Sequence, residues 1–157
     1  MSQEKALAEL TSKIGTETHV SDWLAITQEM IDQFASATFD QQWIHVDPDR
    51  AERESPYKTT IAHGFFTLSL IPYLSGSVDP DTPRFPGVKL SVNYGLNKVR
   101  FPNPVVVGAN LRVHTTLLKV EEVKGGLQLI NQMTIEIQGI EKPACVAETV
   151  SRIYFEA

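Results

Sequence analysis

An aspartate and a histidine, Asp40 and His45, stand five positions apart in the segment Ala37–Ala51. On a continuous helix this spacing would place the two side chains roughly 140° apart, so they can converge only if the chain between them forms a loop. A loop is expected, because helix signals stop near Thr38 and start again at Asp47. A carboxylate and an imidazole at one point form an acid–base pair, since histidine titrates near neutral pH and a partly buried carboxylate can share a proton with it. Asp40 and His45 are therefore the candidate catalytic pair.

A second candidate is the dipeptide His63-Gly64, which opens a strongly apolar segment. Gly64 has no side chain, so a ligand can approach its backbone N–H, and this N–H would lie at the positive end of the expected helix. Such a group is suited to donate to a carbonyl oxygen that gains negative charge during a reaction.

Each of these residues also has a purely structural interpretation. Asp40 could end a helix and His45 could be a surface residue, and their spacing alone does not decide. His63 is better explained as a packing or loop-fixing residue than as a catalyst. A metal site built from these residues and Asp47 is disfavoured, because the spacing matches no recurring ligand pattern and the chain has a single cysteine. We therefore expect no metal.

Helical patterns fill the first half of the chain, with one extended stretch over residues 20–26. Thr27 and Asp47, the latter followed by a proline, are typical helix caps. The expected helices run over residues 2–14, from Thr27 to about Thr38, and from Asp47 to just before Ser55.

The segment Gly64–Leu74 is apolar on nearly every side, which predicts a helix buried all round. Pro72 should kink this helix or end its regular part. From about Gly87 the apolar residues alternate with polar ones, which predicts antiparallel strands with one exposed face. Gly125-Gly126 predicts a hairpin turn, and residues 141–143 are expected to separate the last two strands.

This order of elements predicts an α+β chain with the hot-dog fold, in which an antiparallel sheet wraps around a long central helix. We expect one domain over residues 1–157, with residues 1–19 as an N-terminal helical extension. One such domain leaves sheet edges and part of the helix uncovered, and a homodimer would cover them.

The composition excludes several classes of function. The chain has 157 residues and a net charge of −5, which argues against nucleic acid as the main partner. Its longest apolar run is too short to span a bilayer, the N-terminus lacks the pattern of a secretory signal, and the one cysteine, Cys145, allows no internal disulfide. We expect a cytoplasmic protein that does not bind membranes.

Over about residues 20–155 the sequence resembles the MaoC-like dehydratases, or (R)-specific enoyl-CoA hydratases. The family signature has an Asp, a His five residues later, an Ala six residues after that His, and a His-Gly pair at the central helix, followed by a strand pattern of Phe, Pro-Val and Gly. The matching positions are Asp40, His45, Ala51, His63-Gly64, Phe101, Pro104-Val105 and Gly108.

The chain departs from the signature at Gln42-Trp43, where Asn-Pro is common. Its sequence there is similar to the nodulation-protein-N-like branch of the family. This departure affects the expected shape of the substrate pocket and therefore which acyl groups the protein prefers. Pro72 stands where some members place a site serine, with Ser69 one turn earlier as a substitute.

The resemblance implies reversible hydration of a trans-2-enoyl-CoA to an (R)-3-hydroxyacyl-CoA. Asp40 and His45 would be catalytic, while Gly64 and His63 would lie at the thioester carbonyl. Coenzyme A would be part of the substrate, with no further cofactor. Asn97 and Arg100 belong to a polar and basic cluster that either contacts coenzyme A or is a solvated strand end; its members are Asn93, Tyr94, Asn97, Lys98 and Arg100.

Two alternatives remain at this point. A hot-dog thioesterase would usually place a carboxylate on or near the central helix, but Gly64–Leu74 contains none. A non-catalytic module that binds acyl-CoA is the other alternative, and the intact Asp40–His45 pair argues against it. The sequence does not show which of the two residues is the base and which the acid.

Overall fold

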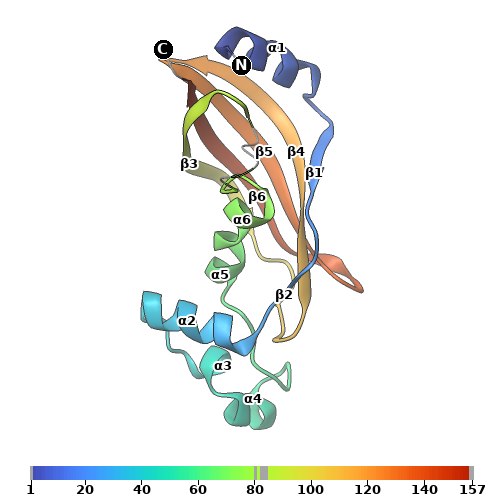
Figure 1. Cartoon of the computed structure of the whole chain (residues 1–157). Helices are drawn as coiled ribbons and strands as arrows, with labels where there is room; N and C mark the ends of the chain where they lie inside the picture. Colours follow the sequence, from blue (N-terminus) through green and yellow to red (C-terminus); the bar gives the residue numbers. More distant parts are fainter. Residues whose placement is uncertain (1, 80, 82–84, 156–157) are drawn as a thin grey trace.

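The computed structural model describes residues 2–79, 81 and 85–155 and consists of a curved antiparallel sheet with helices on its concave side (Figure 1). The strands follow the spatial order β1-β4-β5-β6-β3, and the short β2 also pairs with β4. The elements are α1 (Gln3–Ser12), β1 (Glu17–Val20), β2 (Leu24–Ala25), α2 (Gln28–Thr38), α3 (Trp43–Val46), α4 (Pro48–Glu54), α5 (Gly64–Ser69), α6 (Ile71–Leu74), β3 (Val88–Arg100), β4 (Asn110–Val123), β5 (Gly126–Ile137) and β6 (Ile140–Phe155).

This arrangement is the predicted hot-dog fold, with α5 and α6 as the helix that the sheet wraps. The predicted caps are also confirmed. The Thr27 side chain accepts a hydrogen bond from the Met30 N–H at 3.2 Å, and the Asp47 side chain accepts one from the Arg50 N–H at 3.0 Å. These bonds satisfy N–H groups that have no partner within the helix.

The central helix is interrupted near Pro72, as predicted, and it differs from the prediction in its burial. It is not one long helix, because it breaks at Leu70, whose N–H bonds to the Thr67 carbonyl as in a tighter 3₁₀ turn. Pro72 causes the break, since it lacks an N–H and its ring would clash with the carbonyl four residues earlier. Nor is the helix buried all round in the single chain: Phe65 is 71% exposed and Tyr73 62%.

The turn between the last two strands lies earlier than predicted. β6 begins at Ile140, and the turn is made by Gly139 with a φ of +79° rather than by residues 141–143. Pro143 is tolerated inside β6 because the pairing with β5 is irregular between Ile135 and Ile137. The predicted turn before β5 is present, with Gly125 at a φ of +78°.

Two apolar clusters lie along the same concave face of the sheet. The larger cluster lies beneath α5 and α6, and the smaller one lies beneath α1 (Figure 1). Ala6 and Leu10 of α1 pack on Leu117, Leu127 and Leu129. The expected N-terminal helix thus covers the end of the sheet that the central helix does not reach.

No helix within the described residues is long and apolar enough to cross a bilayer. The cytoplasmic location stays a prediction.

Candidate active site

The candidate catalytic aspartate follows directly on a helix end with an unusual backbone. Helix α2 ends at Thr38, and Phe39 then adopts the left-handed conformation, with φ 65° and ψ 12°. This conformation is uncommon for a residue other than glycine. It turns the chain so that Asp40 leaves the helix end, and the Phe39 side chain remains 88% exposed.

His45 lies in α3, a single helical turn, and is 8% exposed. Its Nδ1–H donates to the Ile61 carbonyl oxygen at 2.7 Å. This bond fixes the tautomer, so the lone pair is on Nε2. Burial lowers the pKa of His45 and the nearby His63 lowers it further, although the bond to Ile61 and the charge of Asp40 oppose them. The ring is therefore a neutral base at neutral pH.

The segment that presents the Ile61 carbonyl is held from two sides. The Ile61 N–H donates to the Ile44 carbonyl of α3 at 3.1 Å, and the Ala62 N–H donates to the Val105 carbonyl at 2.8 Å. The backbone of residues 61–62 therefore joins α3 to the chain before β4, and the position of the His45 ring depends on both.

Gln28, at the start of α2, supports His45 from the other side. Its Nε2 donates to the His45 carbonyl at 2.7 Å, and its Oε1 accepts a hydrogen bond from the hydroxyl of Thr60, which is 1% exposed. One side chain thus links α2, α3 and the segment before α5.

His63 stacks directly on His45, with ring centroids 3.8 Å apart and an interplanar angle of 27°. Its Nε2–H donates to the backbone carbonyl of Asp40 at 3.0 Å, and the ring of Phe34 lies on it at 4.9 Å. His63 is 3% exposed. It therefore packs in the site and also positions both candidate catalytic residues.

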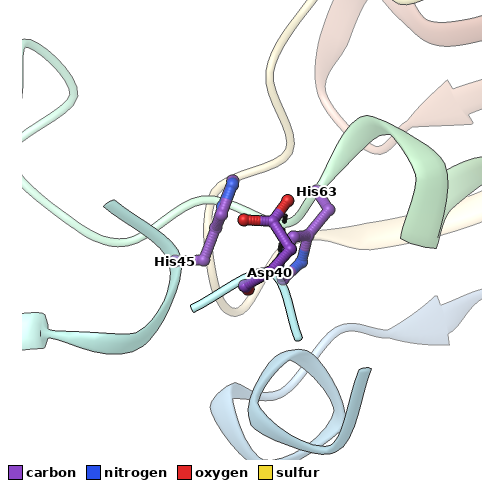
Figure 2. Close-up of side chains that lie close together, drawn as sticks. All are labelled: Asp40, His45 and His63. Atoms are coloured by element: carbon purple, nitrogen blue, oxygen red, sulfur yellow. Dashed lines mark hydrogen bonds and ion pairs between the residues drawn. The ribbon is translucent and has the colours of Figure 1, made fainter. Parts of the chain in front are cut away.

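The side chains of Asp40, His45 and His63 lie close together (Figure 2). Asp40, His45 and His63 each offer an atom within 4.8 Å of the others, and they come from three separate segments of the chain. The connection between Asp40 and His45 is a loop, as predicted, except that its end forms the turn of α3. Because the Asp40 side chain is 52% exposed, an oxygen atom from solvent or substrate can reach the point between it and His45.

The structure explains why residue 64 is glycine. It opens α5, so its N–H has no acceptor within the helix. A Cβ at this position would lie 2.9 Å from Cδ2 of Phe101 and 3.1 Å from its Cγ. The missing side chain therefore makes room for the Phe101 ring. The approach of a ligand to the Gly64 N–H stays a prediction.

The other two predicted substrate contacts are not brought to this site. The Asn97 side chain donates to Glu148 at 2.8 Å, and the Arg100 guanidinium donates to its neighbouring carbonyl at Val99. Arg100 pairs with Val146 of β6. Val146 lies between the buried Cys145 and Ala147, so Val146 and its partner Arg100 lie on the outer face of the sheet. A role of Asn97 and Arg100 in binding coenzyme A stays a prediction.

The same cluster offers donors for a metal ion, but its geometry favours acid–base chemistry. The two stacked imidazoles, with planes 27° apart, direct their in-plane lone pairs along similar planes, which is unfavourable for binding one ion. One nitrogen of each ring already donates to a carbonyl, of Ile61 for His45 and of Asp40 for His63. The remaining His63 nitrogen, Nδ1, is buried without a partner among the described residues.

Three residues of the site were not predicted from the sequence, namely Gln28, Thr60 and Phe34. Gln28 follows the expected helix cap Thr27, and its partners His45 and Thr60 are distant in the sequence. No local pattern could have indicated these contacts, since they depend on how α2 packs against α3 and α5.

Comparisons with known proteins bear on the family and on the fold. The family model described as the MaoC like domain matches residues 9–137. The 3-hydroxyacyl-thioester dehydratase Z of Mycobacterium tuberculosis strain H37Rv is 48% identical over 149 residues, which cover 94% of this chain and 95% of that protein. Nodulation protein N of Rhizobium leguminosarum bv. viciae is 39% identical over 155 residues, covering 98% and 94%.

Solved structures share the fold. A MaoC-like dehydratase from Rhodospirillum rubrum has a TM-score of 0.71 at 22% identity and covers 92% of this chain and 94% of its own. An R-hydratase from Pseudomonas aeruginosa has a TM-score of 0.68 at 22% identity, covering 91% and 83%.

Proposed function

Since this chain belongs to the MaoC-like dehydratase family, we propose that it catalyses the reversible hydration of a trans-2-enoyl-CoA to an (R)-3-hydroxyacyl-CoA. The observation that supports this proposal is the convergence of Asp40 and His45 with His63, the residue directly before α5. The name of the mycobacterial relative, a 3-hydroxyacyl-thioester dehydratase, agrees with the reaction class. The (R) configuration rests on the family resemblance.

The proposed chemistry assigns one task to each group. The Gly64 N–H donates to the thioester carbonyl oxygen, which gains negative charge when the double bond is attacked. A water molecule lies between Asp40 and His45; its oxygen bonds to C3 and one of its protons passes to the pair. The pair delivers one proton to C2, so it ends each turnover in its starting protonation state. The two residues act as one coupled unit.

The positioning of His45 supports its role in this unit. Its Nε2 carries the lone pair, because Nδ1 donates to Ile61. The lowered pKa of His45 keeps this nitrogen unprotonated at neutral pH. The stacked His63 limits rotation of the His45 ring, and it also holds the backbone of Asp40.

We also propose that the protein is a homodimer. Strand β3 lies at an edge of the sheet and is paired on one side only, with β6. Its exposed apolar residues include Leu90, Tyr94 and Leu96, and Phe65 and Tyr73 of the central helix are exposed as well. A second copy that continues the sheet from β3 would cover such an edge. Light scattering at micromolar concentration tests this, and a monomer would contradict it.

The activity is tested with crotonyl-CoA and longer trans-2-enoyl-CoA thioesters, by following the loss of the enoyl absorbance. The expected product is the 3-hydroxyacyl-CoA, identified by a coupled dehydrogenase that accepts only the (R) form. A thiol reagent in a parallel reaction detects free coenzyme A. Release of thiol without hydration would indicate a thioesterase, and binding without either reaction would indicate a non-catalytic module.

A further inference from the structure

One polar residue interrupts the apolar face of strand β5. Six residues of this strand alternate with outward-facing ones and are all buried: Leu127, Leu129, Asn131, Met133, Ile135 and Ile137. Five are apolar, and the sixth, Asn131, is an amide that is 4% exposed. It lies between the two apolar clusters of the concave face, with Leu129 in the smaller cluster and Met133 in the larger.

The side-chain amide of Asn131 makes no hydrogen bond with the residues that the structure describes. Its backbone carbonyl accepts one from the Thr149 hydroxyl at 3.5 Å, and that bond leaves the side chain free. An amide can donate two hydrogen bonds and accept two, and buried polar groups are nearly always hydrogen-bonded. Among the described residues only Nδ1 of His63 is a fully buried polar side-chain atom without a partner. The Asn131 amide therefore reaches solvent-accessible space, where it is available to a ligand.

Neighbouring strands extend the polar surface around Asn131. In the register of the sheet Asn131 pairs with Thr149, and Ser151, two residues further along β6, pairs with Asn93 of β3. Residues two apart on a strand share a face, so these four side chains are adjacent on the concave side. Together they offer two amides and two hydroxyls without a charge.

These four side chains line a cavity of about 390 Å³. Leu10 of α1 closes one side of it, while Ile71 and Pro72 of α6 form another. The charged residues that line it are all exposed, namely Glu9, Lys13, Asp79 and Lys89, and Glu9 pairs with Lys13 at 2.6 Å. The buried part of the cavity therefore suits an uncharged group that forms hydrogen bonds.

The cavity lies further along the central helix from the proposed thioester position. Gly64 opens α5 and Pro72 is eight residues later, which corresponds to roughly 12 Å at the helical rise per residue. An extended acyl chain of about ten carbons spans such a distance, taking C–C bonds of about 1.5 Å.

We propose that this cavity binds the distal end of an acyl chain that carries an uncharged polar substituent, such as a hydroxyl, a carbonyl or an amide, and that Asn131 recognises this substituent. The proposal rests on the proposed function, because it takes the chain to be the acyl part of a thioester held at Gly64. It names a substrate class: oxygenated or amide-bearing acyl-CoA of medium length. The amides of the pantetheine arm share this chemistry, and the experiment separates the two sources.

The test uses saturated thioesters, which cannot be hydrated, as binding probes in calorimetry with the full chain. The probes are decanoyl-CoA, 10-hydroxydecanoyl-CoA and butyryl-CoA, each titrated into the wild type and into Asn131→Leu, which keeps the size of the side chain and removes its hydrogen bonds. The wild type should bind 10-hydroxydecanoyl-CoA about tenfold more tightly than decanoyl-CoA, the usual scale for one buried hydrogen bond. In Asn131→Leu this preference should disappear, while the affinity for butyryl-CoA stays unchanged.

Three results would overturn the proposal. Tighter binding of decanoyl-CoA by the wild type would show that the cavity prefers apolar chains. An equal loss of affinity for all three probes in Asn131→Leu would assign the amide to pantetheine. A lower melting temperature of Asn131→Leu would show that Asn131 supports the fold, whereas an unpartnered amide replaced by leucine should leave the melting temperature unchanged or raised. Since binding is measured without turnover, an inactive wild type would count against the proposed function and not against the cavity.

Discussion

Replacing Gln28 with leucine should destabilise the protein more than the partial exposure of this side chain suggests. Its amide donates to the His45 carbonyl at 2.7 Å and to Asp32 at 2.8 Å, and it accepts from the Thr60 hydroxyl. Leucine has a similar size and can make none of these bonds. The Thr60 hydroxyl, only 1% exposed, would then have no acceptor.

The size of this destabilisation follows from the two groups that lose their partner, the Thr60 hydroxyl and the His45 carbonyl. A buried polar group without a partner costs about 1–3 kcal/mol, and the bond to the exposed Asp32 adds little. We therefore expect Gln28→Leu to lower the free energy of unfolding by about 2–4 kcal/mol. For a chain of this size that corresponds to a drop in melting temperature of roughly 5–15 °C. Activity should fall as well, because α3 carries His45.

Urea unfolding followed by circular dichroism measures this change. Gln33→Leu is the matched control, since Gln33 lies on the same helix, is exposed, and hydrogen-bonds among the described residues to the exposed Glu29, at 3.4 Å. The control should stay within about 0.5 kcal/mol of the wild type. If Gln28→Leu is equally mild, the link from α2 through Gln28 to α3 and Thr60 does not hold the site.

Gly64→Ala should lower both the melting temperature and kcat/KM, because its Cβ would lie 2.9 Å from Phe101. Gly126→Ala is the control: its Cβ would meet the Ile153 backbone, so it should lower the melting temperature alone. The hydrogen bond to Glu136 raises the pKa of His114, with Glu17 contributing. The stabilisation that protonated His114 gives to the folded state is full below about pH 6.5 and is lost as the pH rises through the raised pKa. Urea unfolding at several pH values would show this dependence, and His114→Gln should abolish it. Burial raises the pKa of Cys145 to about 11, so a thiol reagent should label it only in urea.

Local signals in the sequence were sufficient for most of the fold. The caps at Thr27 and Asp47, the hairpin at Gly125 and the alternation along the strands each depend on neighbouring residues only, and the structure confirms them. The interruption of the central helix was also predicted from Pro72, and it lies at Leu70 because a proline disturbs the turn before it.

The parts that could not be predicted depend on tertiary packing. The exposure of Phe65 and Tyr73 reflects which side of the helix the sheet covers, and the alternation of strand residues does not show this. Asp40 and His45 were found from their spacing and resemblance. The stacking of His63 on His45 joins segments that only the folded chain brings together.

The pair Asp40 and His45 is the central claim, and the rate of crotonyl-CoA hydration by Asp40→Asn, His45→Gln and the double variant tests it most directly. Each single substitution keeps the size of the side chain and removes proton transfer, so kcat should fall by about 10²–10⁴-fold with little change in KM. The double variant should be scarcely slower than either single one, since both residues act on the same water. Near wild-type kcat in both single variants would show that the pair is structural and would contradict the proposed mechanism.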